Sequence, residues 1–474
     1  MYQLPRRAAA AAAVLLACAA TGAAAQSIGV AYEQFRLPNG LTVILHRDTT
    51  TPTIATNIWY HVGSGGEMPG RTGFAHLFEH IMFEGSKHVP EGMIDEWFEE
   101  VGGSPNGSTS RDRTNYMQSF SSNALDLALF IESDRMGHLL DAMSAASVDG
   151  QRDVVKNERR QSYDNRPYGL ASQLLTEALY PPSHPYSWPI IGYMDHLGNA
   201  TYEDVVSFFR RYYAPNNATL AIVGDIDVAE AKRLVEKWFA DVPAGEPVAP
   251  RTAEPPVIES TRRIMLEDRV QLPRLYMTWV STGAYQDGDA ALVALGELLA
   301  GGKNSRLYRR LVYELQIADD VSAMQNGGRL GGEFRITATA RTGHTLEELE
   351  RVILAELDSV RRAPPEAREL ERIVNQYEVA FLESLERVST KADQLNEYLY
   401  YTGTPDYFNQ DLGRFRSLTP AALTAAAQRF LDPDRRIVLS IVPRGRPELA
   451  VPGSRLVPNE NLELSPEARK KATD

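Results

Sequence analysis

The sequence predicts an α+β protein of two similar domains, each an antiparallel-rich sheet with helices packed on one face. Three observations lead to this prediction. The composition, with 43% hydrophobic and 23% charged residues, is typical of a globular protein. A proline-rich segment divides the 474 residues into two parts of similar length. The same order of strand and helix patterns follows on each side of that segment, which indicates an internal repeat.

Charge and cysteine content exclude several classes of function. The chain carries 49 Lys and Arg against 62 Asp and Glu, for a net charge of −13. An acidic protein repels phosphate backbones, so we expect no nucleic-acid partner. The single cysteine excludes a disulfide scaffold and a cysteine-based metal cluster. Beyond the N-terminus, no apolar stretch reaches the ~18 residues of a membrane span.

Residues 1–25 have the pattern of a secretory signal peptide. Arg6 and Arg7 precede an apolar run from Ala8 to Ala20, and small residues end at Ala25. An exported, periplasmic protein beginning at Gln26 is therefore expected. Two alternatives remain open: a frayed alanine-rich helix, and a lipoprotein in which Cys18 carries the lipid and anchors the protein to a membrane.

The linker predicted at 242–262 contains five prolines between Val242 and Pro256, which favours an extended, semi-rigid connection. It separates an N-terminal domain at 26–241 from a C-terminal domain at 263–455, and a polar tail follows at 456–474. In the first domain we expect strands at 35–45 (two, around the Asn-Gly turn), 54–62 and 217–223, and helices from about 72, at 201–213 and at 229–239. In the second we expect strands at 275–280 and 436–442, and helices at 290–299 and 419–430.

The most informative stretch is Gly73-Phe-Ala-His76-Leu-Phe-Glu79-His80. Histidines four residues apart lie on one face of a helix, one turn from each other, and can hold one Zn²⁺. Glu79 lies within reach of a water at the same metal. The order His-x-x-Glu-His is the inverted zincin motif. The alternative is a pair of partly exposed histidines without a metal.

A catalytic zinc needs a third protein ligand. Glu158 follows Val154 and Val155, which are expected to mark a buried helix face. Spacing alone leaves Asp153 and Asp164 as alternatives. It also leaves open that Glu158 is an ordinary surface residue paired with Arg152 or Arg159.

Over nearly the whole chain after residue 25 the sequence resembles the pitrilysin/insulinase family of zinc metallopeptidases (inverzincins), most of all the short bacterial branch related to mitochondrial processing peptidase. The resemblance rests on motifs in the family's order: Asn39-Gly40-Leu-Thr, Gly63-Ser-Gly, Gly73 to Gly85, Gly102 to Thr109 with Thr114-Asn-Tyr116, Arg152 to Glu158, Tyr212 to Asn217, and Val223-Gly224-Asp225.

The resemblance implies one Zn²⁺ per chain bound by His76, His80 and Glu158, with Glu79 as general base. It also implies that Asn106, Gly107 and Ser108 line the cleft after an edge strand to which a peptide substrate adds. Turn geometry beside Gly107 is the other explanation of Asn106. The fold implied is one half of a peptidase chamber.

The chain departs from the family pattern in three places. Gln151 stands where a second acidic residue often supports the zinc site. Val312 and Asp319 stand where the family places an Arg and a Tyr after Ser305-Arg306-Leu307, to hold the substrate carbonyl and its oxyanion. Around Glu297 the second domain has Ala294 and Leu298 in place of the two histidines.

These features predict an exported zinc endopeptidase acting on peptides or unfolded segments. The Arg and Tyr side chains that would donate hydrogen bonds to the substrate carbonyl and its oxyanion are missing. We therefore expect a heterodimer in which a related, non-zinc chain supplies them. A homodimer or monomer in which Arg306, Tyr308, Arg309 or Arg310 serves instead is the simpler alternative. The rival functions are a non-catalytic scaffold subunit that keeps the motif and a zinc-storage protein, which the scattered histidines disfavour.

Overall fold

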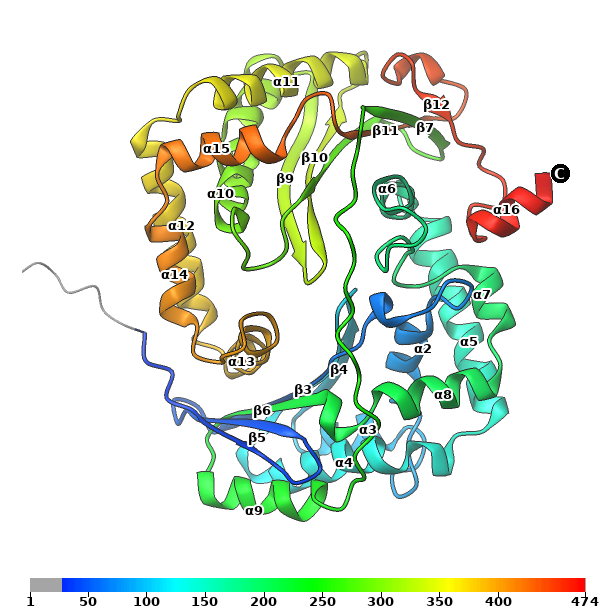
Figure 1. Cartoon of the computed structure of the whole chain (residues 1–474), viewed down its shortest axis with the longest axis vertical. Helices are drawn as coiled ribbons and strands as arrows, with labels where there is room; N and C mark the ends of the chain where they lie inside the picture. Colours follow the sequence, from blue (N-terminus) through cyan, green and yellow to red (C-terminus); the bar gives the residue numbers. More distant parts are fainter. Residues whose placement is uncertain (1–27, 474) are drawn as a thin grey trace, which may run out of the picture.

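Two six-stranded sheets, one from each half of the chain, form the framework of the protein (Figure 1). The structure is a computed structural model that describes residues 28–473. The predicted signal peptide and Cys18 lie outside the described residues. No helix between residues 28 and 473 is both long and apolar enough to cross a bilayer.

The first sheet has the strand order β1-β2-β6-β3-β5-β4. β2 and β6 run parallel, and the other neighbours are antiparallel. The edge strand β4 pairs with β5 in the register Gly107 opposite Tyr116. The strands are β1 (Glu33–Arg36), β2 (Thr42–Arg47), β3 (Thr53–Tyr60), β4 (Ser104–Thr109), β5 (Thr114–Ser121) and β6 (Ala218–Gly224).

The second sheet repeats this topology. Its order is β12-β7-β11-β8-β10-β9, with β7 parallel to β11 and β12, and the remaining neighbours antiparallel. Thus β7, β11, β8, β10 and β9 correspond in order to β2, β6, β3, β5 and β4. The strands are β7 (Arg262–Asp268), β8 (Arg274–Ser281), β9 (Ala318–Gly328), β10 (Gly331–Ala340), β11 (Ile437–Pro443) and β12 (Arg455–Leu456).

Each half has its own set of helices, most of which cover one face of that half's own sheet. In the first half they are α2 (Phe74–Ile81), α3 (Met93–Glu100), α4 (Leu125–Ala142), α5 (Ala145–Arg159), α6 (Ala171–Leu179), α7 (Met194–Asn199), α8 (Tyr202–Tyr212) and α9 (Val228–Phe239). In the second half they are α10 (Asp289–Ala300), α11 (Leu346–Arg362), α12 (Ala367–Ser384), α13 (Val388–Thr402), α14 (Phe408–Arg416), α15 (Pro420–Phe430) and α16 (Pro466–Thr473).

The other face of each sheet is covered by a helix from the opposite half (Figure 1). α13 lies on β3 and β6, where Leu395 and Tyr398 pack with Ile44 and Val223. α6 lies on β8 and β11 of the second sheet in the same way. Lys391 of α13 forms a buried ion pair with Asp48, just after β2. The halves therefore exchange helices, and their interface is part of the hydrophobic core.

The segment between α9 and β7 contains no helix or strand and runs along both halves (Figure 1). Residues after β12 return to the first half. There Leu462 is buried, and Arg469 of α16 pairs with Glu177 of α6 at 2.7 Å. The terminal segment thus helps to hold the two halves together.

The two-domain α+β fold and the repeated order of elements are confirmed. The strands and helices expected from the sequence all form, with ends shifted by one or two residues. Helices cover both faces of each sheet rather than one, because each half lends a helix to the other. The continuous burial of β6, Ala218–Gly224, reflects this two-sided cover.

Candidate metal centre

The two histidines of the inverted motif lie on α2, whose other face is apolar. Phe74, Leu77, Phe78 and Ile81 are buried in the first core, so the helix is fixed against the sheet. His76 and His80 occupy the opposite face and remain partly exposed.

The start of α2 is held by a buried carboxylate that the sequence analysis did not single out. Glu67 is 2% exposed and accepts hydrogen bonds from the backbone amides of Gly73 and Ala75, at 3.0 and 2.9 Å. Gly73 has φ +90°, and a Cβ there would lie 2.6 Å from the carbonyl oxygen of Ile191. Glu67 and Gly73 therefore fix where the helix that carries the two histidines begins.

Glu158 comes from the last turn of α5, a helix that starts with a capping box at Ser144. Val148, Val155 and Arg159 form its buried face. Val154 was expected on that face but is 45% exposed, because it lies about 100° around the helix from Val155. Fully buried Arg159 donates to the carbonyl oxygen of Gly192 and to Gln173, which anchors the helix end beside Glu158.

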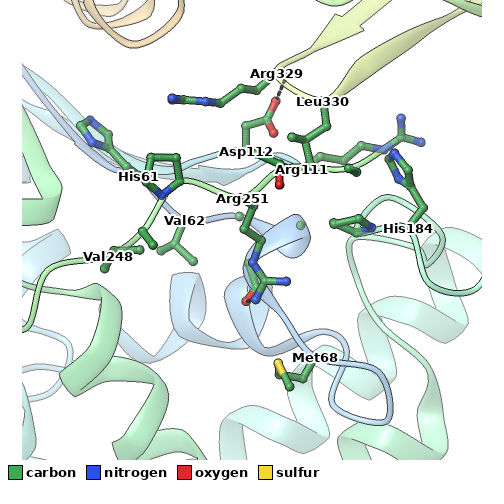
Figure 2. A pocket seen from close by; sticks show the side chains of 18 of the residues that line it. His61, Val62, Met68, Arg111, Asp112, His184, Val248, Arg251, Arg329 and Leu330 are labelled. Carbon is green, nitrogen blue, oxygen red and sulfur yellow. Dashed lines mark hydrogen bonds between the residues drawn. The ribbon is translucent and has the colours of Figure 1, made fainter. Parts of the chain in front are cut away.

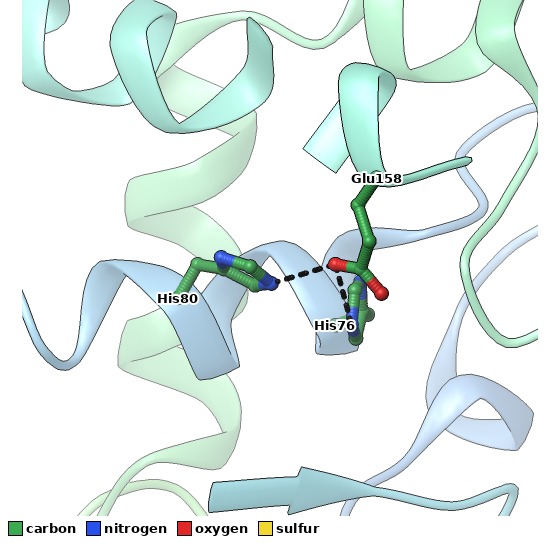
Figure 3. A group of neighbouring side chains, drawn as sticks. All are labelled: His76, His80 and Glu158. Carbon is green, nitrogen blue, oxygen red and sulfur yellow. Dashed lines mark ion pairs between the residues drawn. The ribbon is translucent and has the colours of Figure 1, made fainter. Parts of the chain in front are cut away.

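The structure brings His76, His80 and Glu158 together (Figure 3). Oε2 of Glu158 lies 3.2 Å from Nε2 of His80 and 3.6 Å from Nε2 of His76. Ligands bound at about 2.0–2.1 Å in a tetrahedral zinc site lie about 3.4 Å from each other. These nitrogen and carboxylate donors therefore fit a zinc ion in both spacing and chemical type.

The alternatives for the third ligand do not reach this site. Asp153 is exposed and faces Lys156, and Asp164 lies 3.6 Å from Arg159. The pairing of Glu158 with Arg152 or Arg159 does not form either, since Arg152 binds Asp149. Among residues 28–473, His76, His80 and Glu158 are the one group of His, Cys, Asp and Glu gathered closely enough to hold a metal.

Burial and neighbouring groups prepare the three donors for a cation. Burial lowers the pKa of His76 to about 4, so its ring is neutral and able to bind a metal at neutral pH. The hydrogen bond from His80 lowers the pKa of Glu158, which keeps this carboxylate ionised.

Glu79 lies on the same helix and faces the edge strand β4. Thr109 Oγ1 donates a hydrogen bond of 2.7 Å to Glu79 Oε2. Burial raises the pKa of Glu79, while this hydrogen bond acts in the opposite direction. Thr109 was not recognised as a site residue, although it ends the motif that contains Asn106.

Asn106, Gly107 and Ser108 lie within β4 itself, not after an edge strand as expected. Gly107 faces α2, and a Cβ there would lie 3.0 Å from Cγ of Glu79. Ser108 points to the opposite face and donates to Asn115 at 2.7 Å. Because side chains alternate along a strand, Asn106 lies on the same face of β4 as Ser108. It is exposed, and its Oδ1 accepts a hydrogen bond from the amide of Gly107.

Gln151, at the position of the second acidic residue, donates a hydrogen bond of 2.5 Å to Glu84. Glu84 therefore supplies a carboxylate next to the neutral amide. Within the described chain, no hydrogen bond joins Gln151 to the three metal donors.

The second half contains no corresponding centre among its described residues. Ala294 and Leu298 are buried core residues. Val312 is also in that core, and Asp319 binds Arg341 at 3.1 Å.

The arginines offered as substitutes are engaged elsewhere. Arg306 makes a bidentate pair with Glu369, and Arg310 binds Glu314 at 2.7 Å. Arg309 lies 3.6 Å from Glu314, and the ring of Tyr308 packs near Tyr313. All these partners belong to the second half, and among the described residues no hydrogen bond or ion pair joins any of the four to the site on α2.

Comparison with known proteins adds the family. The model for insulinase (peptidase family M16) matches residues 42–184, and that for the peptidase M16 inactive domain matches residues 199–377. Zinc protease PqqE of Helicobacter pylori is 31% identical over 402 residues, covering 82% of this chain and 88% of that protein. The chain belongs to peptidase family M16.

Other M16 proteins resemble the chain over similar lengths. A probable mitochondrial-processing peptidase subunit beta of Arabidopsis thaliana is 21% identical over 86% of this chain and 77% of its own. The crystal structure of a protease from Helicobacter pylori superimposes with a TM-score of 0.82 at 27% identity, covering 88% of this chain and all of that one. In this M16 chain the three candidate metal donors lie in the insulinase match, and the inactive-domain match, residues 199–377, contains none of them.

Proposed function

We propose that this chain is an exported zinc-dependent endopeptidase that hydrolyses peptides or unfolded polypeptide segments within a chamber. The observation that carries the proposal is the placement of Glu79. It lies on the same helix as His76 and His80, and its side chain contacts the edge strand β4. Names of relatives such as zinc protease PqqE agree with this chemistry.

The edge of β4 that faces away from β5 is open to an added strand, since β4 pairs only with β5 among the described residues. An extended peptide that hydrogen-bonds to this edge passes close to Gly107, where the absence of a side chain lets backbone approach Glu79. Asn106 is exposed on this strand and available to bind the peptide backbone. This arrangement suits unfolded segments better than folded proteins.

A zinc ion, when bound, polarises the scissile carbonyl and allows water to lose a proton near neutral pH. His76, His80 and Glu158 would hold the ion. Glu79 takes the proton from the attacking water and gives it to the leaving amine, acting as base and then as acid. Thr109 orients the Glu79 carboxylate for both steps.

The chain supplies the base but not the donors expected for the developing oxyanion, since Val312 is buried and Asp319 is bound to Arg341. The loss of one such donor commonly costs ~10²–10³ in rate. We therefore infer that this chain is the zinc-bearing subunit of a heterodimer, and that a related non-zinc chain provides an Arg and a Tyr. The subunit name of the Arabidopsis relative supports a paired architecture.

Export rests on the pattern of residues 1–25, with cleavage after Ala25 and a periplasmic location as the proposed outcome. Membrane anchoring follows only if Cys18 is lipidated. Mass spectrometry of the protein from its native cell distinguishes a chain starting at Gln26 from one starting at a lipidated Cys18. A full-length chain starting at Met1 as the only species would contradict export.

The decisive experiment is hydrolysis of a quenched fluorescent peptide mixture by zinc-loaded protein, with and without a chelator. The scaffold alternative predicts no turnover in either case, and metal-dependent turnover excludes it. The heterodimer is tested by adding a related chain that lacks His-x-x-Glu-His. A rise of at least tenfold, lost when the partner's Arg or Tyr is changed, supports it. Full activity of the lone chain, unchanged on mixing, contradicts it.

A further inference from the structure

A cavity of about 950 Å³ lies between the two halves, outside the metal centre (Figure 2). Its walls come from the tip of the β4–β5 hairpin, the tip of the β9–β10 hairpin, the loop after β3, and residues 248–257 of the linker. None of the proposed zinc ligands lines it. We call it the interlobe cavity.

The interlobe cavity is positively charged although the chain as a whole is acidic. Four arginines line it (Arg111, Arg211, Arg251 and Arg329), against two carboxylates, Asp112 and Glu254. Its formal charge is +2, compared with −13 for the chain. Among residues 28–473, none of the four guanidinium groups forms an ion pair. They have instead neutral partners.

Arg111 shows how these cations are held. Its guanidinium lies 5.2 Å from the ring centres of both Tyr180 and Tyr186 and donates to Thr176 at 3.1 Å. The neighbouring carboxylate, Asp112, is occupied by the hydroxyls of Tyr186 and Tyr401 and by the amide of Arg329. Two aromatic faces and a hydroxyl position Arg111 without neutralising its charge.

His184 adds an unpaired donor beside Arg111 (Figure 2). It is 3% exposed, and its Nδ1 accepts from the amide of Tyr186 at 3.0 Å, so Nε2 carries the hydrogen in the neutral ring. Nε2 is buried and has no hydrogen-bond partner among the described residues. A buried donor without a partner costs free energy.

The remaining arginines come from different parts of the chain. Arg251 of the linker donates to the carbonyl oxygen of Gly66, and Arg329 lies over the ring of Tyr400 at 5.0 Å. Arginines from the first half, the linker and the second half therefore line the cavity, and their guanidinium groups point to different parts of its wall (Figure 2). Guanidinium forks match the geometry of carboxylates closely.

The position of the cavity points to a peptide as the carrier of the anion. Arg111 and Asp112 form the tip of the hairpin that begins with β4, and Arg111 follows Thr109, the partner of Glu79, by two residues. Two strand residues span about 7 Å. A peptide added to β4 beside Glu79 therefore runs off the end of that strand toward the cavity.

We propose that the interlobe cavity binds a carboxylate of the peptide substrate, from an acidic side chain or the C-terminus, and so selects acidic peptides. This inference rests on the proposed peptidase function and names its substrate class. Arg111 and Arg329, from the tips of the two hairpins, supply the recognising groups.

The test uses pairs of labelled peptides that share one cleavable sequence and differ only in Glu or Gln, placed in turn at each position on either side of the cleaved bond. Binding is measured by fluorescence anisotropy with zinc-loaded Glu79→Gln protein, which needs no turnover. At one or more positions, we expect the Glu peptide to bind about tenfold more tightly. In Arg111→Gln and Arg329→Gln forms of that protein, the Glu-to-Gln ratio should fall toward one.

Arg329 is exposed, so its substitution serves if Arg111→Gln impairs folding, which thermal unfolding reports. Arg372→Gln on α12, outside the cavity, is the matched control and should leave the ratio unchanged. The proposal is overturned if the Glu-to-Gln affinity ratio equals one at every position. It is also overturned if neither cavity variant alters that ratio. Binding of inorganic phosphate at the cavity without any Glu preference overturns it too, because such binding marks a site for free anions.

Failure of the two proposals can be separated. If wild-type protein cleaves no peptide, either alone or mixed with the related non-zinc chain, while the Glu preference and its loss in the arginine variants are observed, the peptidase function fails and the cavity is still a site for acidic peptides. If peptides are cleaved but Glu and Gln are treated alike, the cavity proposal fails alone.

Discussion

Thr109 donates a hydrogen bond of 2.7 Å to Glu79, so the edge strand that is open to a peptide also orients the proposed base. The donor comes from β4 and the acceptor from α2. Peptide position and base position are therefore fixed relative to each other by one contact. Thr109 acts through Glu79 and is a positioning residue.

Replacement of Thr109 by Val, which keeps the shape but removes the donor, should lower kcat about tenfold, because a hydrogen bond to a charged group contributes about 1.5 kcal/mol. Zinc content and KM should change little. Thr109→Ser restores the donor and should recover most of the activity. Equal loss in both variants would show that the hydroxyl has no positioning role.

Glu79→Gln keeps the size of the side chain and leaves the three metal donors in place. Zinc should stay bound at one per chain, while peptide hydrolysis falls by ~10²–10⁴-fold because the proton acceptor is lost. Metal analysis and a peptide assay on the same sample measure both. Glu99→Gln, on the exposed face of α3, is the control. Near-wild-type turnover in Glu79→Gln would remove Glu79 from the mechanism.

Loss of a ligand should affect the metal itself. Mutation of a residue that only hydrogen-bonds to a metal ligand typically lowers metal affinity by about 10–100-fold. In Glu158→Gln, where a ligand itself is changed, zinc affinity should fall by more than this. His76→Ala and His80→Ala should lose both metal and activity. Asp153→Asn changes a neighbouring carboxylate that the structure places away from the donors, and it should retain zinc. Titration with a competing chelator gives the affinities; comparable losses for Asp153→Asn and Glu158→Gln would contradict the assignment.

The buried pair of Asp48 and Lys391 predicts a pH dependence of stability. Burial raises the pKa of Asp48, but the hydrogen bonds from Lys391 and Thr50 lower it by more than burial raises it. The pKa of Asp48 in the folded protein therefore lies below the ordinary 3.8. The stabilisation by the ion pair is fully present at pH values above the pKa of Asp48 in the unfolded chain. It is lost as the pH falls through the pKa of Asp48 in the folded protein. Asp48→Asn leaves Lys391 unpaired and should reduce the free energy of unfolding at pH 7 by about 3 kcal/mol.

Urea unfolding of wild type and Asp48→Asn at a series of pH values measures this contribution. The difference between them should stay constant above pH ~4 and shrink below it, since the protonated wild-type side chain no longer forms an ion pair. A difference that persists unchanged into strong acid would mean that packing, not charge, explains the loss.

Local patterns were enough to predict the motif helix and most of the repeated elements. His76 and His80 are four residues apart, so helical spacing alone places them on one face. Glu158 could not be separated by spacing from Asp153 and Asp164, because all three lie near the same helix. The structure places Glu158, and neither aspartate, beside the two histidines.

Contacts between distant parts of the chain were not predictable in this way. Asp48 and Lys391 are 343 residues apart, and neither has a local signal of its partner. The same holds for the interlobe cavity, whose arginines come from four separate segments. Periodicity reports which face of an element is buried, but not which element buries it.

Because the two halves exchange α6 and α13, neither half is a complete folding unit. Either half expressed alone would leave one apolar sheet face uncovered, with Ile44 and Val223 exposed in the first half and Leu439 and Ile441 in the second. Such surfaces promote aggregation. Although the chain is built as a repeat, it therefore unfolds as a whole, and neither half can swing away from the other to admit a substrate.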